Sequence, residues 1–346
     1  MSDRGGSQRV FTRRSVLKAA GAAGIGATLL PSVSRASTAA STPPWVTWVK
    51  SFQKKEVKIA VSCFGTLNPF FNPSRVATQD AGGELGIHTL WTGTKNTDTA
   101  AQIAQFQDLV RSGYQAVILI PGESDPWTKP IRDAVDKGVL VLTANQDAPK
   151  SARELFFGQN LYAGGQTQAK LIAKFLGGKR GKVASTNCAP GSDAMFKREG
   201  GVKAGLKSQG FNFVGEVPTD PTDPAKNLSQ VENILRAHPD LVALAPGCAP
   251  DTASAGKAKQ RLRKEIVVVG HDLLPETLEL IKKGVVDATL GQNPYLQVYL
   301  PIMYAYQRVV LGAPKLTLPG SSWDTGTEVV TRANVDKYIT REKRFA

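Results

Sequence analysis

A loop near residue 70 combines a polar amide with two aromatic rings. Residues 55–71 read KEVKIAVSCFGTLNPFF, in which a short apolar run ends in a turn that carries Asn68, Phe70 and Phe71. An asparagine amide can donate to and accept from a hydroxyl group, and aromatic faces can stack on a carbon skeleton. The loop is therefore suited to hold a small hydroxylated molecule.

Other polar or aromatic side chains follow later strand-like runs of the chain. The candidates are Trp127, Asn145, Arg198, Asp251, Asp272 and Gln292. Amides and carboxylates form hydrogen bonds in fixed directions, as vicinal hydroxyls require, and an arginine can fork across two oxygens. A mainly apolar cleft with a few convergent polar groups is the usual way to hold a small polar ligand. This set of side chains predicts a binding site for a sugar-like molecule.

Two successive series of alternating strands and helices would bring these candidates together. The β-branched runs predict strands at 57–62, 88–91, 116–120, 139–143, 182–186, 213–217, 241–245, 266–270 and 288–291. Apolar residues at helical spacing predict helices at 71–85, 97–112, 129–137, 163–176, 195–209, 227–238, 252–262 and 275–283. Such alternation implies βαβ units and parallel sheets, which bind ligands at the carboxyl ends of their strands. We therefore predict an α/β protein with two doubly wound parallel-sheet lobes.

The last part of the chain predicts a hinge. A long amphipathic helix at 295–311 is followed by a late strand at 329–331. A terminal element detached from the second series is most simply placed back on the first lobe, so the chain must cross between the lobes more than once. Hinged lobes can close around a ligand. The predicted domains are a first lobe of residues 55–148 plus 293–318 and a second lobe of residues 149–292 plus 319–346.

The first 36 residues have the order of an export signal. TRRSVLK at 12–18 precedes an apolar run at 19–30, and a small-residue pattern follows at 34–36. The adjacent arginines before an apolar stretch resemble a twin-arginine signal. The apolar run is shorter than the roughly 20 residues that span a bilayer. We expect cleavage near Ala36, a polar linker at 37–54, and a periplasmic or otherwise extracytoplasmic mature protein.

Composition argues against several other classes of function. The 346-residue chain has a formal net charge of +14, of which residues 1–36 contribute +5, leaving +9 (14 − 5) for the rest. No basic run is interleaved with aromatic residues, so nucleic acid is not an expected partner. The three histidines and three cysteines show no metal-ligand spacing, and there is no nucleophile elbow or phosphate-binding loop. We expect neither an enzyme nor a cofactor.

Five segments of the chain resemble one family of binding proteins. They are LNPFF at 67–71, TGTKNTDTAAQIAQFQDLV at 92–110, VVVGHD at 267–272, ATLGQ at 288–292 and DTGTEVVTRANVD at 324–336. Together they resemble the ribose-type, LacI-like periplasmic sugar-binding proteins of ABC importers. The last segment is more similar to the rhamnose, autoinducer-2 and polyol branch. The resemblance covers nearly all of residues 56–340 and implies the type I periplasmic binding protein fold with a multi-crossover hinge.

The resemblance also implies roles for single residues. Asn68 would bond a ligand hydroxyl between flanking aromatic rings, and Arg198, Asp272 and Gln292 match an arginine, a carboxylate and an amide that complete the site. Asn145 stands where the family usually has an aspartate. The family's Asn-Asp after the strand at 241–245 is replaced by PGCAPD, which leaves only Asp251 in register. These departures argue against ribose itself as the ligand.

Several candidates also have a purely structural explanation. Asn68 and Asp272 could cap the helices that follow them, and the two adjacent phenylalanines could belong to the core. Arg198 could be a solvated helix residue, and Trp127 could lie on the rim of the cleft instead of in its wall. The sequence leaves these alternatives open.

Two of the three cysteines follow strands that would be neighbours in a doubly wound sheet. Cys188 comes after the first strand of the second series, and Cys248 comes after the third. Their thiols could therefore approach disulfide distance. Our hypothesis is that they pair after export and that Cys63 remains free.

The combined interpretation is a solute-binding protein, expected to be a monomer, that captures a small sugar or polyol and delivers it to an ABC permease. The alternative is a sensory receptor subunit that closes on a sugar-like signal, such as autoinducer-2, and acts on a chemoreceptor or kinase. The sequence does not separate these functions, because in both of them the partner protein recognises the closed conformation of the two lobes.

Overall fold

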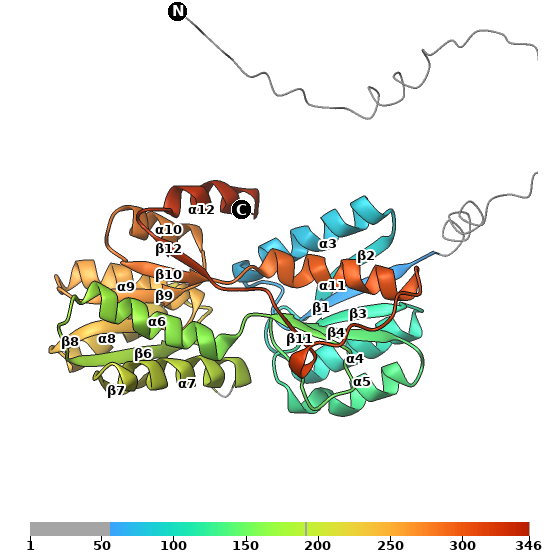
Figure 1. The fold of residues 1–346 in the computed structure, drawn as a ribbon, viewed down its shortest axis with the longest axis horizontal. Helices are drawn as coiled ribbons and strands as arrows, with labels where there is room; N and C mark the ends of the chain where they lie inside the picture. The colour runs from blue at the N-terminus through green and yellow to red at the C-terminus, as the bar shows by residue number, and fades with distance from the viewer. Residues whose placement is uncertain (1–55, 191, 346) are drawn as a thin grey trace, which may run out of the picture. The chain divides into compact units, whose positions relative to one another are not determined.

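Two six-stranded, mainly parallel sheets make up the part of the chain that the computed structural model describes, residues 56–190 and 192–345 (Figure 1). The predicted signal peptide and the linker at 37–54 lie outside the described residues. Each of the ten predicted strands, the late one included, is present within two residues of its expected bounds. The prediction of two doubly wound α/β lobes is therefore confirmed.

The first sheet has the strand order β11-β5-β4-β3-β1-β2, with all pairs parallel. Its strands are β1 (Lys58–Cys63), β2 (His88–Gly93), β3 (Ala116–Ile120), β4 (Leu140–Ala144), β5 (Phe156–Gly158) and β11 (Ser322–Asp324). Its helices are α3 (Asn72–Leu85), α4 (Thr99–Arg111), α5 (Thr128–Val135) and α11 (Pro294–Val309). One face of the sheet packs against α3 and α11, and the other packs against α4 and α5. Runs such as AVILI in β3 are buried throughout because successive side chains enter the two opposite cores.

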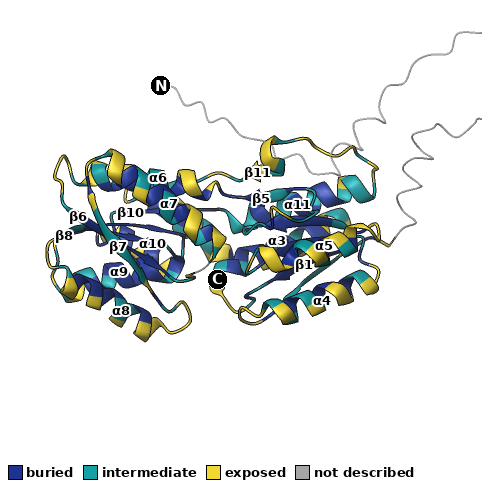
Figure 2. Cartoon of the chain, turned by 90° about the horizontal axis from the view of Figure 1, so that it is seen from below, coloured by how far each residue is buried: buried dark blue, intermediate teal, exposed yellow. Residues whose placement is uncertain are grey.

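The second sheet has the order β12-β10-β9-β8-β6-β7, and β12 is its antiparallel strand. Its strands are β6 (Lys182–Asn187), β7 (Asn212–Pro218), β8 (Leu241–Pro246), β9 (Val267–His271), β10 (Ala288–Gly291) and β12 (Glu328–Thr331). Its helices are α6 (Leu161–Phe175), α7 (Asp193–Ser208), α8 (Pro224–Ala237), α9 (Ala249–Arg261), α10 (Pro275–Lys282) and α12 (Val335–Glu342). One face of the sheet packs against α6 and α7, while α8, α9, α10 and α12 contribute to the core on the other face. In both lobes the inner strands are buried, the edge strands β2, β7 and β11 are partly exposed, and the helices turn their exposed residues outward (Figure 2).

Local sequence signals fix the ends of several helices. The Asp98 carboxylate accepts a hydrogen bond from the backbone N–H of Ala101 at the start of α4, and Asn293 caps α11 in the same way. Helix α3 ends at Gly86, whose φ of 64° is in the left-handed region that favours glycine. Across residues 56–190 and 192–345, no helix combines the length and the apolar character needed to cross a membrane.

The chain crosses between the sheets at 159–160, 292–293 and 325–327, as a multi-crossover hinge requires. The predicted domain bounds need correction, because 149–158 and 319–324 were assigned to the second lobe. These segments contain β5 and β11, which pair with β4 and with each other in the first sheet. Strands of three residues are too short for side-chain alternation to reveal them, and pairing with a neighbour defines them instead.

Candidate functional site

A chain of hydrogen-bonded side chains joins the two lobes where strands β4, β9 and β10 end. Asn145 follows β4 and donates through Nδ2 to the side-chain oxygens of Gln292, at 3.1 Å, and Gln297, at 2.9 Å. Gln292 follows β10, and its Nε2 donates to Oδ1 of Asp272, at 2.9 Å, just after β9. Three predicted site residues from different strand ends are therefore brought together in one polar cluster.

The backbone at both ends of this cluster is unusual. Asn145 has a φ of 60° and Asp272 a φ of 70°, in the left-handed region that side chains other than glycine rarely adopt. Each is held by a backbone hydrogen bond, from Asn145 to Phe157 and from Asp272 to Leu290. Conformations of this kind cost free energy and are concentrated at binding sites, where they aim a side chain.

Arg198 is a buried cation of the second lobe. It lies in α7 with 3% of its surface exposed, and its Nη1 donates to the carbonyl oxygen of Gly247 at 2.5 Å. Its Nε and Nη2 are buried and have no partner among the described residues. Burial lowers the pKa of Arg198, and the nearby Asp272 carboxylate opposes that shift, so the guanidinium remains charged. Arg198 lines a small pocket of about 10 Å³ with Asn187 and Glu216 of the second lobe, and its Nε–H and Nη2–H bonds have no acceptor among the described residues.

The pKa of the Asp272 carboxyl is raised, whereas that of Arg198 is lowered, and burial is the main cause of both shifts. Burial raises the pKa of Asp272, while the Arg198 charge and the hydrogen bond from Gln292 lower it. A buried carboxylate beside a buried guanidinium can accept from one hydroxyl of a ligand while the arginine donates to another. Asp272 thus belongs to the polar cluster between the lobes, and no hydrogen bond from its side chain to the start of α10 is found among the described residues.

The loop after β1 divides its residues between cleft and core. Asn68 caps the short 3-10 helix Pro69–Phe71 by accepting from the backbone N–H of Phe70 at 3.0 Å, so the capping alternative is confirmed for its Oδ1. Phe71 is 2% exposed and packs edge-to-face against Phe64 and Phe70 in the first-lobe core. Phe70 is half-buried and lines a cavity of about 140 Å³ whose other wall comes from the second lobe.

A larger cavity of about 350 Å³ lies on the other side of the polar cluster, beside β5 and β11. First-lobe residues Asn145 and Gln146 line it together with Asp193 and Lys197 of α7. Ser192 Oγ donates to Gln146 Oε1 across the lobes at 3.3 Å. Asn145 lines this cavity and Gln292 lines the smaller one, so members of the polar cluster border both cavities, and both lobes contribute to the walls of each.

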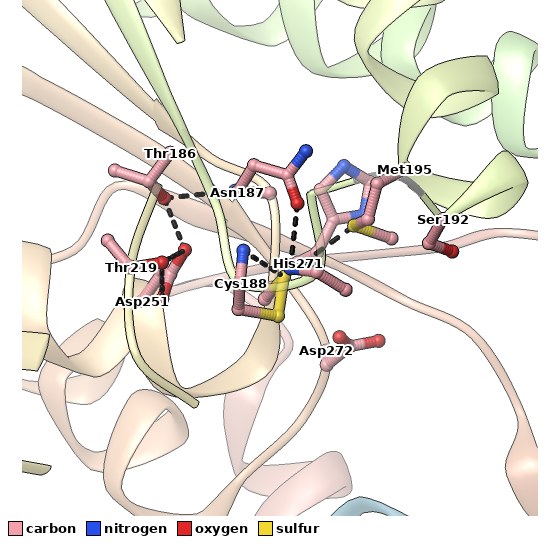
Figure 3. Close-up of a disulfide and its surroundings, with 12 residues drawn as sticks. Thr186, Asn187, Cys188, Ser192, Met195, Thr219, Asp251, His271 and Asp272 are labelled. Atoms are coloured by element: carbon pink, nitrogen blue, oxygen red, sulfur yellow. Dashed lines mark hydrogen bonds between the residues drawn. A yellow bond between two sulfur atoms is a disulfide. The ribbon is translucent and has the colours of Figure 1, made fainter. Parts of the chain in front are cut away.

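Two predicted site residues lie in the interior instead. Asp251 is fully buried in the second lobe and accepts hydrogen bonds from Thr186 at 2.5 Å and Thr219 at 2.9 Å (Figure 3), and from Asn227 at 2.7 Å. Its carboxylate is satisfied by its own lobe and does not face the cleft, although burial raises its pKa.

Trp127 likewise belongs to the first-lobe core and not to the cleft. It has no exposed surface, and its ring packs edge-to-face against Phe106 of α4 with centroids 5.4 Å apart. It lies under α4 and α5 in the core on the face away from α3 and α11. Trp127 is therefore a packing residue.

The cleft also contains contributors that sequence reasoning missed. Gln297 is completely buried one turn into α11, accepts from Asn145 and donates to Gln292 at 3.2 Å. A lone amide on the buried face of an apolar helix (YLQVYL) is the signal that could have identified it. The Gly247 group that accepts from Arg198 is a backbone carbonyl, so no side chain in the sequence could have indicated its role.

The disulfide hypothesis is confirmed. Cys188 and Cys248 are bonded, with their Cα atoms 6.1 Å apart, at the carboxyl edge of the second sheet (Figure 3). Cys63 is the unpaired cysteine of the described residues and is fully buried at the end of β1. Burial raises the pKa of its thiol to about 12.

Comparison with known proteins gives a consistent result. A family model described as a periplasmic binding protein domain matches residues 59–313. The xylose/arabinose-binding protein XylF of Sulfolobus acidocaldarius is 27% identical over 79% of this chain and 71% of its own length. The ribose import binding protein RbsB of Bacillus subtilis is 29% identical over 73% of this chain and 82% of its own.

Solved structures share the fold over their whole length. An ABC transporter solute-binding protein from Burkholderia graminis, in complex with D-arabinose, superposes with a TM-score of 0.76 at 26% identity, covering 81% of this chain and 96% of that one. The Caulobacter myo-inositol binding protein, bound to myo-inositol, superposes with a TM-score of 0.74 at 24% identity, covering 83% and 98%. The second likeness, at its lower identity, bears on the fold alone.

Proposed function

Because the chain belongs to the periplasmic binding protein family, we propose that it is an extracytoplasmic binding protein that holds one small sugar or polyol between its lobes. On this proposal it delivers the ligand to an ABC permease. The similarity to xylose/arabinose-binding and ribose import binding proteins supports a sugar as the ligand class. The more specific resemblance to the rhamnose, autoinducer-2 and polyol branch stays a prediction.

The observation that carries the proposal is the unpaired Arg198 guanidinium beside the interlobe cluster. A buried cation whose Nε and Nη2 lack a partner among the described residues costs free energy unless a ligand completes its hydrogen bonds. The adjacent Asp272 and the amides of Asn145 and Gln292 accept and donate in directions that suit vicinal hydroxyls. Phe70 lies on the first-lobe side of the cleft, where its ring can cover the C–H surface of a sugar.

Isothermal titration calorimetry of the purified protein against D-ribose, D-xylose, D-arabinose, D-allose and myo-inositol tests the ligand class. We expect saturable one-to-one binding of at least one compound, together with a rise in the melting temperature. Lys207→Ala, which removes an exposed cation from α7, serves as a control variant and should bind as the wild type does. Absence of heat and of thermal shift with every compound, from a protein with native circular dichroism, would contradict the proposal.

Export and assembly form a separate part of the proposal. The twin-arginine pattern at 12–18 supports export in the folded state, with cleavage near Ala36. Intact-mass analysis of the periplasmic fraction should then find a chain that begins near residue 37, and Arg13→Lys with Arg14→Lys should keep the precursor inside the cell. Light scattering of the mature protein should give the mass of a monomer.

A transport role predicts a further phenotype. A strain without this protein should lose high-affinity uptake of the bound sugar and regain it on complementation. A strain that keeps full uptake but loses a transcriptional or chemotactic response to the sugar would favour the sensory alternative.

A further inference from the structure

The disulfide lies at the edge of the second sheet from which the ligand-facing residues project (Figure 3). Cys188 directly follows β6, and Cys248 is the N-cap residue of α9, two positions after β8. Strands β6 and β8 are parallel neighbours, so their carboxyl-end loops leave the sheet side by side. The bond joins these two loops across a sequence separation of 60 residues.

A direct structural path leads from the disulfide to Arg198. Gly247, adjacent to Cys248, uses its carbonyl oxygen to accept from Arg198 Nη1 at 2.5 Å. Its own N–H donates to the Thr186 carbonyl at 3.1 Å. A Cβ atom at position 247 would lie 2.4 Å from that same carbonyl oxygen, so the close approach requires glycine. The orientation of the carbonyl that holds Arg198 is thus fixed by the backbone next to the bridge.

The bridge also contacts the helix that carries Arg198. Cys248 Sγ lies 3.6 Å from Sδ of Met195. Met195 precedes Arg198 by three residues on α7, so the two side chains share one face of the helix. The disulfide therefore touches both the helix of Arg198 and the loop of its hydrogen-bond acceptor.

We propose that the Cys188–Cys248 disulfide is a positioning device for Arg198, so that the affinity for the sugar depends on the oxidised state of the bond. The inference rests on the proposed function. With the bond intact, the loop at 247–248 holds the guanidinium through Nη1, while Nε and Nη2 have no partner among the described residues and on this proposal donate to the ligand. Without it, this loop gains conformational freedom that ligand binding must remove.

The redox chemistry involved is a simple exchange. A dithiol reductant supplies two electrons and two protons to the sulfur–sulfur bond, leaving two protein thiols, and is itself oxidised to a cyclic disulfide. Cys188 is half-buried and therefore closer to solvent than Cys63, which is fully buried in the other lobe. Native reduction followed by alkylation should therefore label two cysteines and leave Cys63 unmodified.

The first test compares oxidised and dithiothreitol-reduced wild-type protein in the calorimeter, using the member of the five-compound panel that binds most tightly. We expect reduction to weaken binding about tenfold, the size of one hydrogen bond to a charged group. Reoxidation should restore the affinity. Unchanged affinity in fully reduced protein with native circular dichroism would overturn the inference and leave sugar binding intact. Failure of the oxidised protein to bind any compound would overturn both.

The second test separates positioning from general stabilisation by a double-mutant cycle. It compares the wild type, the Cys188→Ser/Cys248→Ser variant, Arg198→Lys, and the combination of all three substitutions. Arg198→Lys keeps the positive charge, and with it measurable binding, but removes the forked guanidinium. If the bridge acts through Arg198, its loss should cost about tenfold in the wild type and less than about twofold in the lysine background. Equal losses in both backgrounds would show a merely structural bond and overturn the inference.

Discussion

The two faces of the cleft differ in chemical character, since one is neutral and partly aromatic and the other carries buried charges. The first-lobe face (Phe70 and Asn145) consists of an aromatic ring and a neutral amide, and the loop that carries Phe70 is anchored in the core by Phe71. The second-lobe face (Arg198, Asp272 and the Gly247 carbonyl) consists of buried charges held by hydrogen bonds and braced by a disulfide. A face positioned by packing should fail when volume is removed, whereas one positioned by charge should fail when a polar partner is lost.

The largest effect should come from the anchor of the first-lobe face. Phe71→Ala removes a fully buried ring and should lower the free energy of unfolding by about 3–5 kcal/mol, measured by urea denaturation. The matched variant Phe70→Ala removes a half-buried ring and should cost markedly less stability while weakening sugar binding about tenfold. If Phe71→Ala proved as stable as Phe70→Ala, the first-lobe face would not depend on core packing.

Arg198→Ala tests the second-lobe face. It deletes the donors that are free to meet the ligand and leaves Asp272 buried without its cation, so sugar affinity should fall about a hundredfold. Calorimetry against the tightest-binding sugar measures the loss. Lys207→Ala, an exposed cation on the same helix, should leave the affinity within about twofold. A similar affinity in wild type and Arg198→Ala would remove Arg198 from the site.

The sequence predicted those residues of the two faces that lie directly after strands. Long buried runs such as AVILI locate the strands, and parallel strands place the residues after them along one edge, so the convergence of Asn145, Asp272 and Gln292 followed. Asp251 also follows a strand, but its partners come from β6, the loop after β7 and α8, and only the folded structure shows that they satisfy its carboxylate. Trp127 also could not be placed from sequence, because its ring packs against Phe106 of α4, a contact that only the fold reveals.

The short strands β5 and β11 were missed for a related reason. Three residues carry no alternation that sequence can detect, and these strands exist because each pairs with a neighbour. Their absence from the prediction misplaced two segments at the hinge. Sequence thus identifies elements with their own periodicity, while elements and hydrogen-bond partners defined by neighbours require the fold.

A smaller effect, on the pH dependence of the free energy of unfolding, should come from a carboxyl group of the second lobe. On β7 of the second lobe, burial and a hydrogen bond with Glu199 raise the pKa of Glu216 from 4.5 to about 7. Between these values the folded state binds a proton that the unfolded chain has released, so the free energy of unfolding should fall as pH rises from about 4.5 to about 7. Below that window both states are protonated, and above it both are ionised, so this group then adds no slope.

Urea denaturation at a series of pH values checks this expectation. Glu216→Gln keeps the oxygen that accepts from Asn187 Nδ2 at 2.8 Å but cannot titrate, so it should flatten the slope within the window. Glu265→Gln replaces an exposed carboxylate of the same lobe and should retain the wild-type slope. An identical pH dependence in wild type and Glu216→Gln would assign the slope to other groups.

The smallest effect concerns a contact between the lobes outside the site. Arg344, which follows α12 of the second lobe, pairs with the Asp80 carboxylate of α3 and lies 5.2 Å over the ring of Tyr295 in α11. Its side chain is 57% exposed, so solvent weakens the pair, and the contact is worth at most about 1 kcal/mol. The contact exists in the same conformation in which Asn145 reaches Gln292, so its loss should release part of the constraint on the two faces.

Arg344→Ala should therefore weaken sugar binding by only about two- to fivefold in calorimetry, with the exposed neighbour Lys343→Ala as the matched control. Raising the salt concentration should shrink the difference between wild type and Arg344→Ala, since an exposed ion pair is screened. The Arg198→Ala loss should change little with salt, because that charge is buried. If Arg344→Ala cost as much affinity as Arg198→Ala, the site would depend on how the lobes are held together more than on the composition of its two faces.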